Sequence, residues 1–315
     1  MRGFVTDPAG VVRALPEALS WEMEYGVGTP CDSFVLRCPW EMGAQEEMQS
    51  WVGFYAEHEG VRVFTGRIDE CEVTLDGRGC VLEVAGRGMA ALLLDNEALG
   101  QDYQLAALED ILREHVAPYG IEVGAKPQLP AVSRFRVDTG SSEWTVLEEF
   151  LRACGGETPR FDPMGRLVLG PWEEAGALLL DDESPIIRLC RRERRYGVLS
   201  EVLVRDRYSG RVERVENSAF RALGGQVRRV LTMPGHAAGQ EMGLTGQEQL
   251  ERSGREQREL EVTLPVPFYA MPGQLVRVER RNFEGNGLYA AARSTVGGDE
   301  TGYWTRLILR PPEQM

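Results

Sequence analysis

Histidines and carboxylates are the side chains here that could do acid–base or metal chemistry, but their spacing indicates neither. His58, His115 and His236 fall on a predicted strand end, a helix and a glycine-rich loop, with no His-Glu-x-x-His or comparable ligand pair. Residues 181–183, Asp-Asp-Glu, lack the interleaved spacing of a calcium-binding loop and are interpreted as an acidic linker. No Ser-His-Asp set, phosphate-binding loop or nucleophile elbow is present. The sequence therefore predicts no catalytic residue, no cofactor and no metal site.

A glycine-rich segment imitates a dinucleotide-binding fingerprint. Gly86-Arg87-Gly88 followed by Ala91 would place a pyrophosphate at the amino end of a helix that begins near Met89. Such a site needs a parallel strand–helix–strand unit and an acidic residue about 20 positions further on. Here the preceding strand is predicted to pair in a hairpin, and another helix follows Asn96. The glycines are interpreted instead as residues that release a strand into a turn.

The densest basic cluster is Arg188, Arg191, Arg192, Arg194 and Arg195. Arginines can neutralise phosphates, but only Tyr196 adds an aromatic side chain and the net charge of the chain is −14. The cluster opens a strand next to the acidic linker, so its arginines are predicted to pair with carboxylates of the same or a neighbouring subunit.

Charge and composition bound the class of protein. Residues 1–183 hold 14 basic and 33 acidic residues, a net −19, whereas residues 184–315 hold 21 and 16, a net +5. This asymmetry indicates that different faces meet different partners, with unevenly charged solvated surfaces as the alternative. With 43% hydrophobic and 27% charged residues, the chain is of globular type. It contains neither a membrane-spanning apolar run nor, over residues 1–19, a recognisable signal peptide, and its six cysteines are predicted to be reduced and buried.

Alternating apolar residues predict two strand-rich segments. The first contains residues 19–25, 33–38, 51–56 and a long hairpin over 61–85 that turns at Asp76-Gly77; the second contains residues 198–205, 211–215, 226–231, 260–264, 274–279, 289–295 and 303–309. Strands at this spacing are typical of barrels or sandwiches. The predicted fold is mainly β with an α+β insert: a first β-barrel domain over residues 1–96, a small α/β insert domain over 97–183, and a second, similar β-barrel domain over 184–315.

Three further helices are predicted. Apolar residues at helical spacing indicate one over Leu105 to Val116. A second runs from Glu143 to Ala153, with Ser141 or Ser142 as the N-cap and Gly155-Gly156 as its end. The third, Thr245 to Arg258, has little apolar surface to bury in its own domain, so it is predicted to lie at a subunit boundary.

These segments resemble a known family. Phe64-Thr65-Gly66-Arg67-Ile68-Asp69, the hairpin, and Val84-Ala85-Gly86-Arg87-Gly88 with the apolar helix and Asp95 resemble the baseplate hub proteins of contractile phage tails. The resemblance is to the Mu-like hub, late control protein D and defective-prophage tail hub group. It continues through the helix over residues 144–154 and the hairpin over residues 161–169. Gly88 stands where the family usually has an acidic residue, so no role of that carboxylate is carried over.

The resemblance implies a structural hub of a phage, prophage or tail-like bacteriocin. In that role a homotrimer, with two similar barrels in each chain, would adapt the hexameric tail tube to the central spike. The implied partners are the chain itself, the tail tube protein, the central spike protein, the tape-measure protein and other baseplate proteins, with DNA passing transiently through the lumen and no membrane insertion. The implied location is the baseplate of a virion or tail-like particle, assembled from protein made in the bacterial cytoplasm. Candidate subunit-interface residues are Glu248, Arg252, Arg255, Arg191, Arg192 and Arg194.

Two other functions stay open on the sequence. A tail-associated peptidoglycan hydrolase would need a cleft with two carboxylates of different pKa, and 49 acidic residues pick out no pair. A monomeric carbohydrate-binding β protein is suggested by Trp21, Trp40, Trp51 and Tyr55, although aromatic side chains on strands usually belong to the core.

Overall fold

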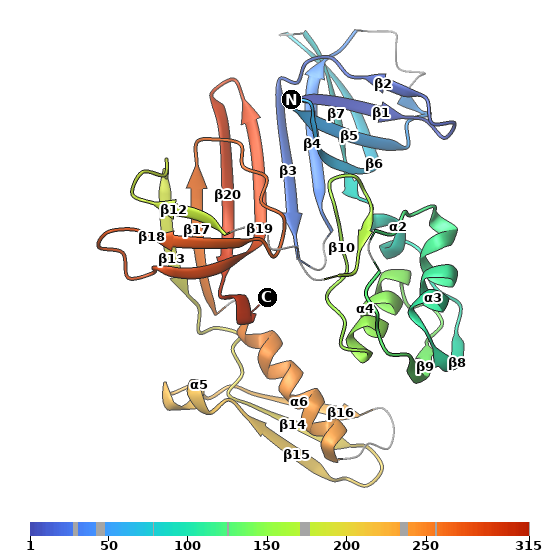
Figure 1. Ribbon diagram of the computed structural model, residues 1–315, viewed down its shortest axis with the longest axis vertical. Coiled ribbons are helices and arrows are strands. Elements are labelled where there is room, and N and C mark those ends of the chain that lie inside the picture. The colour runs from blue at the N-terminus through green and yellow to red at the C-terminus, as the bar shows by residue number, and fades with distance from the viewer. Residues whose placement is uncertain are drawn as a thin grey trace. The chain divides into compact units, whose positions relative to one another are not determined.

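The computed structural model shows a mainly β protein whose contacts divide into two compact units (Figure 1). It describes residues 1–27, 31–41, 48–77, 79–124, 126–170, 177–233, 239–255 and 257–314. Unit 1 comprises Met1–Ala175, Leu264–Gln274 and Arg293–Arg306, and unit 2 comprises Gly176–Thr263, Leu275–Ala292 and Leu307–Met315. The predicted mainly β class is confirmed. His236 lies outside the described residues.

Unit 1 begins with an antiparallel sheet. Its strands are β1 (Arg2–Thr6), β2 (Val12–Ala14), β3 (Ser20–Gly26), β4 (Ser33–Pro39), β5 (Gly53–His58), β6 (Val61–Asp76) and β7 (Gly79–Gly88). They lie in the order β3-β4-β7-β6-β5-β1-β2, and residues 293–298 pair with β3. No closed barrel is found among the described strands. Alternate residues of β3 and β4 point into a core in which the rings of Phe34 and Phe54 stack at 3.8 Å.

The glycines of the β6–β7 hairpin bring two backbones close together. A Cβ at Gly66 would lie 2.2 Å from the carbonyl oxygen of Arg87, and one at Gly86 would lie 2.0 Å from that of Arg67. Only glycine fits these positions. The expectation that these glycines release the strand into a turn is confirmed at Gly88, where β7 ends before a turn at residues 89–90, and is wrong at Gly86, which stays paired within β7.

A helical layer follows in residues 89–170. Its elements are α2 (Ala91–Leu94), β8 (Gln101–Ala106), α3 (Leu108–Ile111), the π-helical turn η1 (Leu112–Val116), η2 (Ala117–Tyr119), β9 (Val132–Val137), α4 (Glu143–Ala153), β10 (Arg160–Phe161) and β11 (Leu167–Val168). Helix α4 has the predicted bounds, and the Ser142 hydroxyl accepts the Thr145 amide N–H at 3.1 Å. The helix predicted from Leu105 is wrong at its start, because Leu105 is an exposed residue of β8 and pairs with β9.

Unit 2 contains two sets of strands. The first is β12 (Leu178–Asp181), β13 (Arg188–Glu193), β17 (Arg258–Leu264), β18 (Leu275–Glu279) and the unit 2 parts of β19 (Gly287–Asp299) and β20 (Gly302–Arg310). The second is a three-stranded sheet of β14 (Glu201–Asp206), β15 (Val212–Glu216) and β16 (Arg228–Met233), in the order β15-β14-β16 with β14 and β16 parallel. The short helix α5 (Ser218–Ala222) joins β15 to β16.

Helix α6 (Gly239–Gly254) lies across the three-stranded sheet (Figure 1). Met242 and Leu250 are buried against Val202 and Val204 of β14. At Gly246 an added Cβ would lie 2.5 Å from Val215 Cγ2, so glycine lets the helix approach the sheet closely. The predicted helix over 245–258 therefore begins and ends too late. The expectation that it has little apolar surface to bury is also wrong.

Candidate functional site

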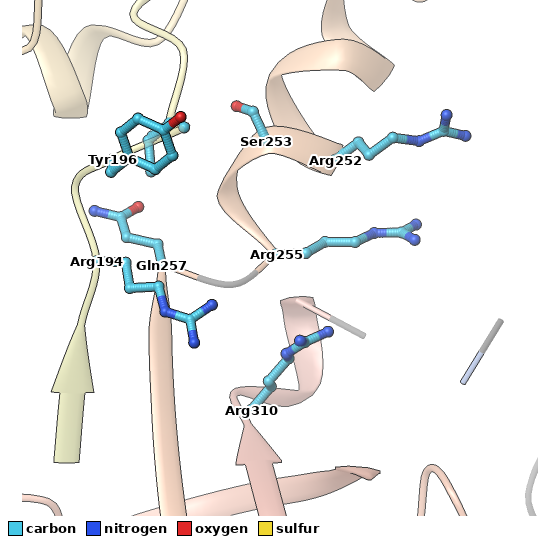
Figure 2. A pocket seen from close by; sticks show the side chains of 9 residues that line it. Arg194, Tyr196, Arg252, Ser253, Arg255, Gln257 and Arg310 are labelled. Carbon is cyan, nitrogen blue, oxygen red and sulfur yellow. The ribbon is translucent and has the colours of Figure 1, made fainter. Parts of the chain in front are cut away.

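An arginine-lined pocket of about 570 Å³ lies within unit 2 (Figure 2). It forms where the chain leaves β13, where α6 ends, where β17 begins and where β20 ends. We call it the arginine pocket. Its lining residues are Arg194, Tyr196, Gly197, Val198, Arg252, Ser253, Arg255, Gln257 and Arg310. Four arginines from three segments of the chain thus line one concave site.

Hydrogen bonds hold these segments together. The hydroxyl of Ser253, in the last turn of α6, accepts the backbone N–H of Leu199 at 3.0 Å and donates to the carbonyl of Leu250 at 2.7 Å. The backbone N–H of Arg194 donates to the carbonyl of Gln257 at 2.8 Å. The end of the helix is therefore fixed to the strand exits on either side of it.

A buried carboxylate neutralises part of the charge beside the pocket. Glu259 of β17 has a side chain that is 6% exposed, and Arg310 Nη2 lies 2.8 Å from its Oε1. Arg194 Nη2 lies 3.5 Å from Oε2 of the same carboxylate, and Arg192 Nη1 lies 3.9 Å from it. A buried carboxylate needs cations and hydrogen bonds around it. Arg194 and Arg310 therefore have a structural partner already.

The other two guanidinium groups differ. Arg252 and Arg255 are exposed, and within the described part of the chain neither forms an ion pair. In Figure 2 both extend in the same direction from the end of α6. Tyr196, at the edge of the pocket, is 98% exposed. The pocket therefore has two kinds of arginine. Arg194 and Arg310 are paired with Glu259, whereas Arg252 and Arg255, like the ring of Tyr196, are exposed to solvent.

The structure brings three of the six predicted interface residues together, Arg194, Arg252 and Arg255. Arg191 pairs with Glu193 at 2.8 Å, and Arg192 also reaches Glu261 at 3.4 Å. Glu248 is exposed on α6 and does not line the pocket. The prediction that the basic cluster pairs with carboxylates of its own subunit is confirmed for these arginines.

Residues that carry the family resemblance form a second charged cluster, in unit 1. Arg87 Nε lies 2.7 Å from Asp69 Oδ2, and Arg87 Nη2 lies 2.6 Å from Asp95 Oδ2. The hydrogen bonds that Arg87 donates to Asp95 and Asp69 raise the pKa of Arg87, and the same hydrogen bonds lower the pKa of Asp95. One guanidinium thus ties β6 and β7 to the end of α2. Strand β7 pairs antiparallel with both β4 and β6, which is not the arrangement of a dinucleotide site.

A buried polar cluster in unit 1 was missed by the sequence analysis. His115 Nδ1 lies 2.6 Å from Glu143 Oε2, the Tyr119 hydroxyl donates to Glu143 Oε1 at 3.0 Å, and the Tyr103 hydroxyl lies 3.0 Å from His115 Nε2. Burial raises the pKa of Tyr119, and the hydrogen bond to Glu143 raises it further. Glu143 lies in the first turn of α4, where the helix dipole favours a negative charge. His115 is therefore a packing histidine, but it is not an isolated one.

The structure also bears on the predicted aromatic residues, cysteines, metal ligands and membrane spans. Trp21 and Trp51 are buried in the core of unit 1, and Tyr55 stacks on Phe4 at 4.6 Å, so these aromatics are not an open sugar-binding platform. All six cysteines are free thiols, but only Cys38 is buried and the other five are partly buried, so the predicted burial is wrong for those five. Across the described ranges, no group of three or more His, Cys, Asp or Glu could hold a metal ion. No helix of the described residues is both long and apolar enough to cross a membrane.

Comparison with known proteins identifies relatives of this fold. Residues 90–171 match the family described as "Baseplate hub protein gp44-like, second domain". The structure resembles the prophage MuSo2 43 kDa tail protein of Shewanella oneidensis, with 17% identity over 100% of this chain and 99% of that chain and a TM-score of 0.77. It also resembles the tail protein of Neisseria meningitidis MC58, with 16% identity over 98% and 96% of the two chains and a TM-score of 0.73.

A more distant similarity is to the c3393 protein of E. coli, described as a component of the type VI secretion system that is structurally similar to T4 bacteriophage tail proteins gp27 and gp5. Identity is 15% over 94% of this chain and 73% of that chain, with a TM-score of 0.56. No curated protein matched the sequence. The family match over residues 90–171 and the similar tail-protein structures confirm the resemblance to the baseplate hub family.

Proposed function

With a baseplate hub domain at residues 90–171 and a tail-protein fold along its length, we propose that this chain is the structural hub of a contractile-tail baseplate. The observation that carries the proposal is the end-to-end fold match with a prophage tail protein, in which almost the whole of both chains is superimposed. The hub has no enzymatic role in this proposal. It works through shape and symmetry.

The proposed assembly is a homotrimer. Each chain would contribute two similar strand-rich domains, over residues 1–96 and 184–315, flanking the insert over 97–183. Three chains would then present six quasi-equivalent domains to the hexameric tail tube and threefold symmetry to the central spike. The tape-measure protein and other baseplate proteins are further proposed partners. DNA would pass through a lumen lined by part of the −19 charge of residues 1–183, which would keep DNA from binding.

The subunit boundary is proposed to include α6 and the basic cluster. Glu248, Arg252 and Arg255 are exposed on or just after α6, and Arg191, Arg192 and Arg194 lie on or next to β13. Arginine is enriched in protein interfaces because its planar group forms several hydrogen bonds at once. This surface is therefore the proposed contact region.

The proposal is tested by measuring the mass of the purified full chain in solution and by imaging the particle along its symmetry axis. We expect a species of three chains, each of 35.1 kDa, with threefold symmetry and six lobes. A zymogram on cell-wall substrate serves as the control for a hydrolase. A ring of any other symmetry, or clearing of the cell-wall substrate, would contradict the proposal.

A further inference from the structure

We infer that the arginine pocket is a docking site for carboxylates on an acidic segment of a second copy of this chain. The inference rests on the proposed trimeric hub, because it supplies the contact by which neighbouring copies recognise each other. It concerns Arg252, Arg255 and Tyr196 as the groups that meet the incoming segment, above the arginines that hold Glu259.

Two arginines of the pocket already bind a carboxylate of their own chain, which is buried beside the pocket. Arg194 and Arg310 approach Glu259 from two different segments, and their nitrogens lie 3.5 and 2.8 Å from its oxygens. Guanidinium groups form paired, charge-assisted hydrogen bonds with carboxylates. A second carboxylate that entered from solvent would meet the same type of group in Arg252 and Arg255, at an exposed position.

The pocket is left with excess positive charge. Four arginines line it, Glu259 offsets part of that charge, and Arg252 and Arg255 have no ion-pair partner in the described ranges. Two neighbouring guanidinium groups can both pair with carboxylates of one incoming segment, and their exposure makes that attraction sensitive to salt. Tyr196 offers a ring that a partner could cover, and tyrosine and arginine are the residue types that most often dominate binding energy in interfaces.

The charge distribution of the chain favours a second copy as the occupant. Residues 1–183 carry −19 and residues 184–315 carry +5, so one copy offers the acidic surface that the pocket of another copy needs. A nucleic acid fits less well, because a chain with a net charge of −14 repels polyphosphate at long range. The ligand is therefore assigned as carboxylate-bearing peptide.

The first experiment measures self-association of the full chain by sedimentation at low and high salt. The test variant is Arg252→Glu with Arg255→Glu. The matched control is Arg205→Glu with Arg207→Glu, which reverses two exposed arginines of unit 2 outside the pocket. We expect high salt to weaken association, the test variant to weaken it about tenfold or more, and the control variant to associate like the wild type.

The second experiment measures binding of labelled hexaglutamate by fluorescence polarisation, with hexathymidylate as the phosphate-bearing comparison. We expect hexaglutamate to bind the wild type and the control variant and to bind the test variant about tenfold more weakly. Hexathymidylate that binds in the pocket more tightly than hexaglutamate would overturn the carboxylate assignment. Equal binding of hexaglutamate to the test variant and the wild type would overturn it too. So would the absence of hexaglutamate binding to the wild type, the control variant and the test variant alike.

The two experiments together separate this inference from the proposed hub. A trimer that forms equally well in the test variant overturns the pocket as a docking site and leaves the hub intact. A chain that stays monomeric but binds hexaglutamate through Arg252 and Arg255 supports the carboxylate site and counts against the trimer.

Discussion

The His115 cluster of unit 1 and the arginine pocket of unit 2 use polar side chains in opposite ways. In the first, His115 is 4% and Glu143 is 6% exposed, and each has hydrogen-bond partners inside the protein. In the second, Glu259 beside the pocket is buried and paired with arginines, while Arg252 and Arg255 face solvent. A polar cluster that is satisfied internally fixes a unique packing arrangement. A cluster with guanidinium groups left over is available to a partner. The contrast separates a structural site from a binding site.

Asp32 gives the sharpest test of how unit 1 treats a partly buried carboxyl group, because no cation pairs with it in the described ranges. Burial raises its pKa to about 7, although the N–H of Gly26 donates to its Oδ1 at 3.0 Å. The folded state therefore holds the proton more tightly than the unfolded state. Stability from this group is fully present below pH about 4 and is lost as the pH rises through about 7.

In the wild type, we expect the contribution of Asp32 to the free energy of unfolding to fall by about 4 kcal/mol between pH about 4 and about 7. We expect the Asp32→Asn variant to lose this pH dependence. The asparagine oxygen can still accept the Gly26 N–H. Urea unfolding at several pH values measures the effect. Asp138→Asn, which removes a carboxylate that is 75% exposed, should leave the pH profile as it is in the wild type. A wild type whose stability does not fall between pH 4 and 8 relative to Asp32→Asn would show that Asp32 titrates normally.

Glu143→Ala tests whether the His115 cluster is structural. The substitution leaves His115 Nδ1 and the Tyr119 hydroxyl without their partner inside the core, so we expect a loss of about 3 kcal/mol in the free energy of unfolding. Glu149→Ala, on the exposed side of the same helix, should change it by less than about 0.5 kcal/mol. If urea unfolding showed the same loss in the free energy of unfolding for both variants, the His115 cluster would not be a structural site.

The sequence predicted some elements better than others. Elements marked by local signals were located, whereas those that depend on contacts between residues far apart in the sequence were not. Alternation along one strand was enough to locate most strands, and the cap and glycine signals of α4 are local, so its bounds were predicted correctly. The helix from Leu105 was wrong because Leu105 pairs across to Ser133 on β9, a contact that periodicity does not record. Gly239 and Gly243 hid the part of α6 that precedes Thr245, since glycine lowers helix propensity.

The site residues show the same limit. The basic cluster was visible as a run of arginines, and Arg252 and Arg255 were predicted with it. Arg310 was missed, because its contact with Glu259 joins positions 51 residues apart. The His115 cluster joins residues on η1 and α4 that are 28 positions apart, and no local pattern marks the pair. Charge type is therefore readable from the sequence, whereas charge pairing requires the fold.

Leu250→Ala tests whether the packing of α6 supports the arginine pocket. Leu250 is 5% exposed against β14, and its loss leaves a cavity under the turn that precedes Arg252 and Arg255, so we expect unit 2 to lose about 2 kcal/mol of stability. Leu244→Ala removes the same atoms from a side chain of α6 that is 62% exposed, and should cost less than about 0.5 kcal/mol. Because the arginines are carried by the end of this helix, hexaglutamate should bind the Leu250 variant more weakly and the Leu244 variant normally. If the Leu250 variant lost stability but bound hexaglutamate like the wild type, the pocket would depend on its strand exits and not on the helix.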